Sequence, residues 1–208
     1  MSNNENSLKA RWLSDEGKCF IDVILNRRTT PQEYQDACFE FFGKRNSFIQ
    51  SQTFRGNGEF EDLRGVDFSD RDLKGMVFSK SDLSFADFRG SALEGASFSG
   101  AKLYSATFKN VVATTRIDFF ETYAQGADFQ GVKLLDCNFC NADLTCANFS
   151  DALLEQCDFG GALFRQSICD GAKMTDCNVG GLRFAEKFRD DDWFKNSTLK
   201  NREYIIWE

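Results

Sequence analysis

The chain has 208 residues, of which 42% are hydrophobic, enough for one domain with a continuous buried core. Its 25 basic and 32 acidic residues give a net charge of −7, which argues against direct nucleic-acid binding. No stretch approaches the roughly 20 apolar residues that a membrane helix needs, so no membrane partner is expected. The polar start, Met1 to Ser7, is expected to be a disordered tail on a cytoplasmic protein, and its Ser and Asn content leaves a secreted effector open.

Residues 1–50 are predicted to form a helical N-terminal cap. An apolar face over about residues 15–27 predicts one helix. A capping box with Pro31 at the first helical position predicts a second helix, which Gly43 can end. Two such helices would cover the open end of a repeat array, because an uncovered last repeat exposes apolar core. The alternative is a separate recognition module.

A five-residue ladder dominates residues 51–187. A Leu or Phe recurs every fifth position, a small residue stands two positions before it, and Asp or Asn often stands between them. Gly often closes the unit. The predicted structural core is Leu63, Phe68, Leu73, Phe78, Leu83, Phe88, Leu93, Phe98, Leu103, Phe108, Phe119, Phe129, Leu134, Phe139, Leu144, Phe149, Leu154, Phe159 and Phe164.

A period of five fits neither an α-helix nor an ordinary strand. It fits a four-sided coil in which each side is one pentad, so that twenty residues complete a turn. Successive turns would stack in parallel at the ordinary strand spacing of roughly 4.8 Å and share one core. Phe and Leu then occupy separate columns, which explains the 23 Phe residues.

The unit Ala86-Asp87-Phe88-Arg89-Gly90 resembles the pentapeptide-repeat family. The resemblance covers roughly residues 54–187 and implies an all-β solenoid, a right-handed quadrilateral parallel β-helix. The register breaks once, because Phe108 and Phe129 are 21 residues apart, which predicts one extra residue near positions 111–115. That residue is either a tolerated insertion or a contact for a partner.

Residues 188–208 are predicted to be a capping or dimerisation tail. Three consecutive acids, Asp190 to Asp192, look like a helix start, and Tyr204 to Trp207 is strand-like. Related proteins often carry a dimer contact at this end, so the resemblance leaves a homodimer open.

No catalytic, cofactor or metal site is predicted. The chain has no His, which excludes catalytic triads and histidine zinc motifs. Cys137-Asn138-Phe139-Cys140 is a Cys-x-x-Cys, but the repeat turns Cys137 inward and Cys140 outward. Cys137, Cys157 and Cys177 are spaced by twenty, so they are expected to form one internal column of small fillers.

Charge divides unevenly along the ladder. Residues 55–116 hold nine acids and nine bases, whereas residues 118–170 hold nine acids and only two bases, a difference of −7. These nine acids form the candidate interaction surface: Asp118, Glu121, Asp128, Asp136, Asp143, Asp151, Glu155, Asp158 and Asp170. The surface is either simply hydrophilic or an imitation of duplex DNA.

The prediction for function is a non-catalytic scaffold that binds another protein. The resemblance implies one specific version, because some family members imitate DNA to protect gyrase and topoisomerase IV from quinolones or peptide toxins. The alternative is a secreted bacterial effector or regulatory adaptor that uses residues 1–50 or one face of the solenoid.

Overall fold

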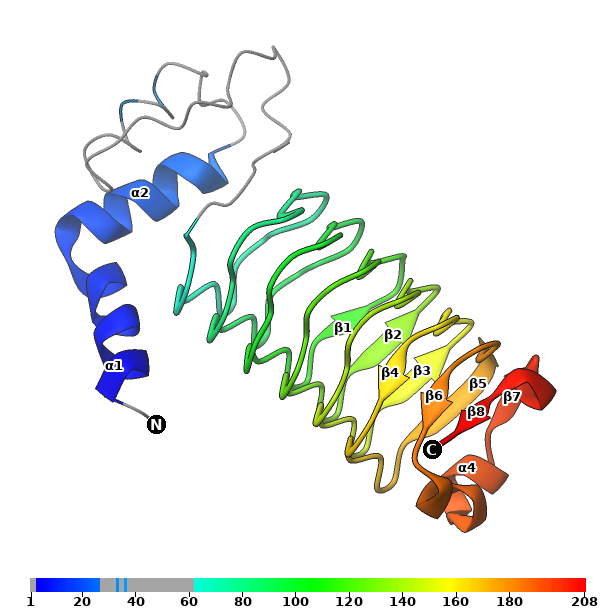
Figure 1. The fold of residues 1–208 in the computed structure, drawn as a ribbon. Coiled ribbons are helices and arrows are strands. Elements are labelled where there is room, and N and C mark those ends of the chain that lie inside the picture. The colour runs from blue at the N-terminus through cyan, green and yellow to red at the C-terminus, as the bar shows by residue number, and fades with distance from the viewer. Residues whose placement is uncertain (1–2, 27–32, 34–35, 37–61) are drawn as a thin grey trace.

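The structure is a computed structural model that describes residues 3–26, 33, 36 and 62–208. From residue 62 onward the chain winds into a right-handed quadrilateral β-helix, as predicted (Figure 1). Each turn pairs in parallel with the next turn, beginning with Asp62 beside Asp82 and Asp67 beside Asp87. We name the four sides, in chain order, by their first inward residue: the Leu63, Phe68, Leu73 and Phe78 sides.

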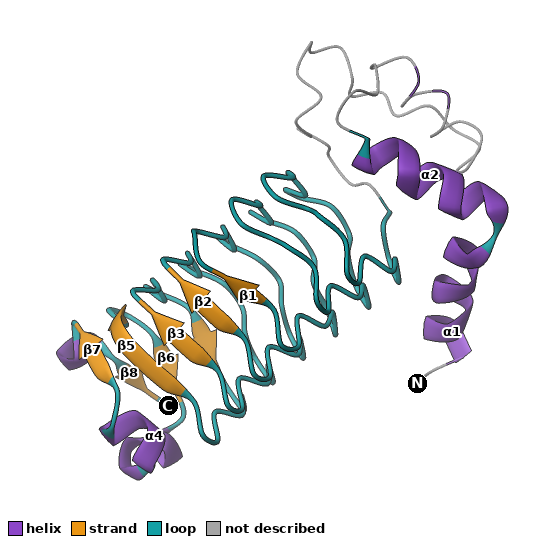
Figure 2. Ribbon diagram, turned by 180° about the vertical axis from the view of Figure 1, so that it is seen from behind, coloured by secondary structure: helices purple, strands orange, loops and turns teal. Residues whose placement is uncertain are grey.

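Regular strands occur on two of the sides (Figure 2). On the Leu73 side they form a sheet in the order β1 (Val112–Ala113), β2 (Lys133–Leu135), β3 (Leu153–Glu155), β5 (Lys173–Asn178) and β7 (Thr198–Lys200). On the Leu63 side they are β4 (Leu163–Phe164), β6 (Arg183–Phe184) and β8 (Ile206–Trp207). All neighbouring strands in both sheets run parallel.

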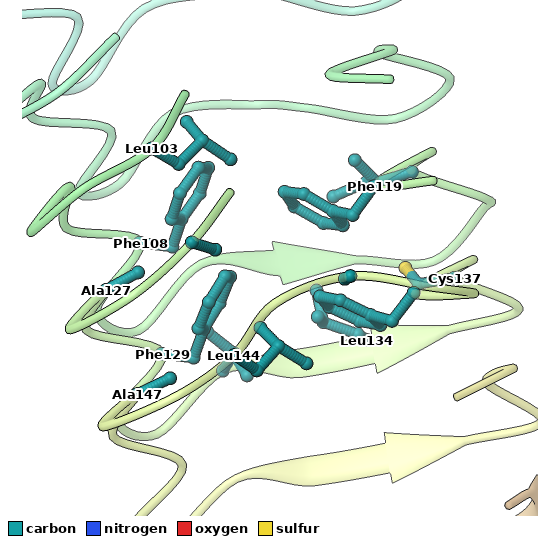
Figure 3. Packing of buried hydrophobic residues seen from close by; sticks show 14 of the residues in the cluster. Leu103, Phe108, Phe119, Ala127, Phe129, Leu134, Cys137, Leu144 and Ala147 are labelled. Carbon is teal, nitrogen blue, oxygen red and sulfur yellow. The ribbon is translucent and has the colours of Figure 1, made fainter. Parts of the chain in front are cut away.

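The interior is filled by the predicted ladder. Each Leu and Phe of the predicted structural core is at most 3% exposed. Phe rings stack within a column, as Phe119 does on Phe139 at 4.7 Å between centroids, and meet the other Phe column edge to face. Figure 3 shows Phe108 and Phe129 in one such stack, with Leu103 and Leu144 close to them. The rod therefore has a packed core rather than a pore.

The extra residue lies near the end of the predicted segment. Val112 and Ala113 pair with residues 21 positions later, whereas Asp118 pairs with Asn138, twenty positions later. Ala113 is buried as the inward residue of its pentad, and Ile117 is buried in the next small-residue slot. The insertion therefore falls between Ala113 and Ile117, and the Phe stacks on both sides of it are undisturbed.

Some corners of the coil bring glycine close to a side chain of the preceding turn. Gly171 has a φ of +72°, a conformation that suits glycine. A Cβ placed on Gly171 would also lie 2.6 Å from Oδ1 of Asp151, one turn earlier. Gly171 thus satisfies both a backbone conformation and a close approach.

The N-terminal residues are helical, which corrects the expectation of a disordered tail. α1 (Asn3–Ala10) leads through η1 (Arg11–Leu13) into α2 (Asp15–Leu25). A Glu5–Lys9 ion pair of 3.0 Å links successive turns of α1, and its backbone at Lys9 lies against Gly65 of the first coil. Packing on the solenoid thus stabilises a segment whose composition is polar.

The helix expected near residues 15–27 is confirmed as α2, and its N-terminal cap is Ser14, whose hydroxyl accepts the N–H of Gly17. The second predicted helix lies largely outside the described residues, which include neither Pro31 nor Gly43. No helix within the described part of the chain is long and apolar enough to cross a membrane.

The C-terminal residues continue the coil and then cover its end. β7 adds a strand to the sheet on the Leu73 side, and β8 adds one to the sheet on the Leu63 side. η2 (Glu186–Asp190) and α4 (Asp192–Lys195) precede β7, and η3 (Arg202–Tyr204) lies between β7 and β8. Phe188, Trp193 and Phe194 are buried against the last turn of the core. The helix start predicted at the three acids is confirmed, whereas the domain boundaries and the dimer contact stay predictions.

Candidate interaction surface

Four of the nine candidate acids hold the coil together. Asp118, Asp128, Asp143 and Asp158 stand directly before an inward residue, and each carboxylate accepts the backbone N–H of the residue two positions later. The distances run from 2.8 Å at Asp158 to 3.3 Å at Asp118. This local turn explains why the repeat favours Asp or Asn in that slot.

The same four carboxylates also bind side chains of neighbouring turns. The amides of Asn138, Asn148 and Asn178 donate to Asp118, Asp128 and Asp158, respectively, at 2.8 to 3.1 Å. Gln125 donates to Asp143 at 2.6 Å. The alternation of Asp with Asn keeps like charges from stacking directly at the strand spacing. These acids are half-buried and engaged in structural hydrogen bonds.

The other five acids are exposed: Glu121, Asp136, Asp151, Glu155 and Asp170. They include two neighbouring pairs. On the Phe68 side the N–H of Asp151 donates to the carbonyl of Asp170 at 2.8 Å, and on the Leu73 side the N–H of Asp136 donates to that of Glu155 at 2.9 Å. Each pair therefore spans adjacent turns and points carboxylates outward from neighbouring sides of the rod.

The nine acids together occupy all four sides. Asp128 joins Asp151 and Asp170 on the Phe68 side, and Asp143 lies on the Leu63 side. Asp118, Glu121 and Asp158 lie on the Phe78 side. The exposed charge thus forms a band around the second half of the rod, in which the Phe68 and Leu73 sides carry the paired carboxylates.

The Cys-x-x-Cys residues point apart. Cys137 is 1% exposed and lies in the core with Cys157 and Cys177, where its Sγ donates to the carbonyl of Leu135 at 3.6 Å. Cys140 lies on the outer face, and burial together with the Asp158 carboxylate raises the pKa of its thiol to about 11. A protonated thiol is a poor nucleophile and a poor metal ligand.

Thiol stacking and burial also raise the pKa of Cys157 and Cys177. Cys177 donates to the carbonyl of Leu154 at 3.4 Å, so its thiol fills space and satisfies a backbone acceptor. Among the residues that the structure describes, no group of three or more His, Cys, Asp or Glu side chains is arranged to hold a metal ion.

One surface feature was not predicted from the sequence. A hollow of about 470 Å³, open to solvent, lies on the Leu73 side over β1, β2, β3 and β5. It is lined by Val112, Leu153, Lys133 and Lys173, which occupy the outward slot that often carries Asp or Asn on the Phe68 and Phe78 sides. Comparing the residues that occupy this slot in successive turns of the Leu73 side would have revealed the apolar and basic column in the sequence.

These features define a class of protein: a repeat scaffold with a filled core, a banded charged surface and helical segments at its ends. The chain belongs to the pentapeptide-repeat family. The family model, pentapeptide repeats, matches eight copies over residues 62–100, 81–112, 125–161 and 147–181. No curated protein matches the chain in sequence.

Solved structures of other pentapeptide-repeat proteins are similar to this one. A trypsin-treated form of QnrB1, a plasmid-mediated fluoroquinolone resistance protein, is 20% identical with a TM-score of 0.50, over 72% of this chain and 91% of that chain. HetL, involved in heterocyst differentiation regulation in the cyanobacterium Nostoc sp. strain PCC 7120, is 20% identical with a TM-score of 0.37, over 70% of this chain and 71% of that one. At this identity the likeness to QnrB1 supports the fold.

Proposed function

We propose that the protein is a non-catalytic scaffold whose acidic second half binds a DNA topoisomerase, such as gyrase, by imitating DNA. Binding at the DNA site would compete with the drug- or toxin-trapped complex and so protect the enzyme. The similarity in fold to a fluoroquinolone resistance protein is consistent with this role.

The observation that carries the proposal is the exposed acidic band. Between residues 118 and 170 nine acids face only two bases, and five of the acids are exposed carboxylates with no role in the turns. DNA-binding surfaces are lined with Lys and Arg that contact phosphates. A rigid rod presents carboxylates at the strand spacing, and the Lys and Arg of a DNA-binding surface could contact these in place of phosphates.

The test is a supercoiling assay with purified gyrase, a quinolone and this protein. The variant replaces Asp136, Asp151 and Asp170 with Asn. Two of these residues have positive φ, a conformation that Asn tolerates as well as Asp, so the coil is preserved. We expect the variant to protect gyrase at least about tenfold less well at low salt, because three outward charges are lost. Raising the salt concentration should weaken the wild-type effect as well.

The matched control also replaces three exposed Asp with Asn, at Asp15, Asp22 and Asp70, outside the acidic band. Its net charge equals that of the first variant, and it should protect gyrase as the wild type does. Equal loss in both variants would indicate a general charge effect. A wild-type protein without effect on supercoiling or on quinolone inhibition at micromolar concentration would refute the proposal for gyrase.

A further inference from the structure

The hollow on the Leu73 side has an apolar floor and borders the inserted segment. Ala113, Leu134 and Leu154 form the floor, and Ala113 stands where neighbouring turns have Leu. Thr114, at the start of the inserted segment, lines the end nearest the insertion. The extra residue and the small Ala113 thus shape the hollow locally, without disturbing the core.

Two large apolar side chains are exposed in the hollow. Val112 is 50% exposed and Leu153 is 45% exposed. Both lie in the column that runs Val112, Lys133, Leu153, Lys173 through successive strands. The backbone is already fully paired within the sheet here, so an incoming partner can bind only through side chains laid across the strands.

Charge surrounds the exposed leucine in a defined pattern. Lys133 and Lys173 are the strand neighbours of Leu153, one on either side, which sets them roughly 9.6 Å apart along the rod at two strand spacings. Within the described residues neither ammonium group takes part in an ion pair. Glu155 lines the opposite edge, and the exposed Asp136 lies beside it, its N–H donating to the Glu155 carbonyl, so the patch is not uniformly basic.

This pattern distinguishes between kinds of partner. On a helix, residues i and i+7 lie on one face about 10.5 Å apart, with i+3 and i+4 between them. On an extended strand, side chains of one face repeat at roughly 6.8 Å or 13.6 Å, which does not match the lysine spacing. A second copy of this chain, related by a two-fold axis that passes through Leu153 perpendicular to the rod, would place its own lysines against Lys133 and Lys173. The carboxylates at the far edge would repel a uniformly acidic partner.

We propose that this hollow binds an amphipathic helix of a partner protein, lying along the rod, with acidic residues at i and i+7 on Lys133 and Lys173 and apolar residues at i+3 and i+4 on Leu153. Basic residues on one flank of the helix would meet Glu155 and Asp136. The surface is separate from the exposed carboxylates of the Phe68 side, but it shares Asp136 and Glu155 with the acidic band. Lys133, Leu153 and Lys173, on which this test rests, have no part in the proposed topoisomerase role.

The test uses a labelled alanine-based helical peptide of about 16 residues, a length at which such helices begin to be stable. It carries Glu at i and i+7, Leu at i+3 and i+4, and Lys on one flank. Fluorescence anisotropy should show saturable binding to the full-length protein. The double variant Lys133→Glu/Lys173→Glu should bind at least about tenfold more weakly, because two attractions become repulsions. Leu153→Ser should weaken binding to a similar degree.

A charge-swapped peptide, with Lys at i and i+7, makes the test specific. It should bind the double variant and not the wild type. The matched control Lys102→Glu/Lys109→Glu changes charge equally on two other sides of the rod and should leave binding of the first peptide unchanged. The proposal is overturned if the control weakens binding equally, if the swapped peptide does not restore it, or if a proline-containing, non-helical peptide binds as well.

Discussion

At the scale of one residue, Gly17 shows how a close contact can reverse the usual preference of a helix for alanine over glycine. In an exposed helix, Gly→Ala stabilises by about 1 kcal/mol. Gly17 is buried in α2, and a Cβ there would lie 2.9 Å from the Cα of Trp12 and also collide with the Arg11 carbonyl. Both obstacles are backbone, which cannot swing aside as a side chain can. We expect Gly17→Ala to lower hydrogen-exchange protection of α2 by at least about tenfold, a loss of about 1.4 kcal/mol.

Lys18→Ala, at the adjacent exposed position, is the control for this substitution. It removes only a long 3.9 Å ion pair with Asp15 and should change protection little. Higher protection in Gly17→Ala than in the wild type would show that the close approach between η1 and α2 does not constrain the helix.

Single positions also show where sequence reasoning was sufficient. The inward Leu and Phe residues could be predicted because each meets the same demand every five positions. The role of Asp118 and Asp158 in the turns could not, since their slot is outward and looks like a surface charge until its N–H partner is known. Four of the nine candidate acids therefore have a structural role that the charge count alone does not reveal.

At the scale of elements, η1 supplies hydrogen-bond donors to the first described turn of the coil. In the solenoid the carbonyls of each turn accept N–H groups from the turn before, but Asp62 begins the first described turn. Arg11 Nη2 donates to the carbonyls of Asp62 and Arg64, each at 2.9 Å, and Trp12 Nε1 donates to Arg64 at 2.8 Å. Arg11 also binds the Asp62 carboxylate through both terminal nitrogens. Side chains of η1 thereby satisfy carbonyl groups at the edge of the first described turn.

Arg11→Ala is therefore expected to destabilise the protein by roughly 2 to 3 kcal/mol, because it leaves the part-buried Asp62 carbonyl without this donor and removes charged hydrogen bonds to the Asp62 carboxylate. Arg11→Lys should recover only part of the loss, since one ammonium cannot reproduce the planar set of donors. Urea unfolding of the full-length chain measures both. A cost for Arg11→Ala no larger than that of an exposed substitution such as Lys18→Ala would show that η1 does not stabilise this end.

The elements at the ends were predicted unevenly. α2 has an amphipathic face and a cap, so its pattern is visible in the sequence. α1 has no apolar stripe over Asn3–Ala10, and its contact with Gly65 depends on where the first coil lies. Short polar helices are marginal by themselves, so tertiary contact decides whether they form.

For the whole molecule, one repeat determines the rod but leaves its outer faces independent. Inward columns must match from turn to turn, whereas each outward column can change without cost to the core. The candidate acidic surface was therefore visible as a charge count, while the hollow on the Leu73 side depends on which outward residues become strand neighbours. Partner recognition follows from these outward columns and not from the ladder that defines the fold.

The two ends of the rod are also where ionisation supports the structure. Burial alone would raise the pKa of Asp62, but hydrogen bonds from Arg64 and Arg11 outweigh it and hold that pKa well below its ordinary value of 3.8. At the other end, Arg165 at 2.6 Å and Arg183 at 3.2 Å lower the pKa of Glu208. A lowered folded-state pKa contributes stability that is complete above the ordinary pKa and is lost as the pH falls toward the folded value.

Acid should therefore loosen the solenoid from its ends inward. Between pH 6 and pH 3, protection factors corrected for intrinsic exchange should fall first in residues 62–85 and 183–208, while the stacked Phe119, Phe139 and Phe159 region stays protected. Asp62→Asn should be less protected at the N-terminal end at pH 6 and should lose little more on acidification, because the titrating group is gone. The C-terminal end of that variant retains Glu208 and should respond to acid as in the wild type. Simultaneous loss along the whole rod would mean instead that the stacked turns unfold as one cooperative unit, and that the arginine-bound carboxylates at the ends do not govern its stability in acid.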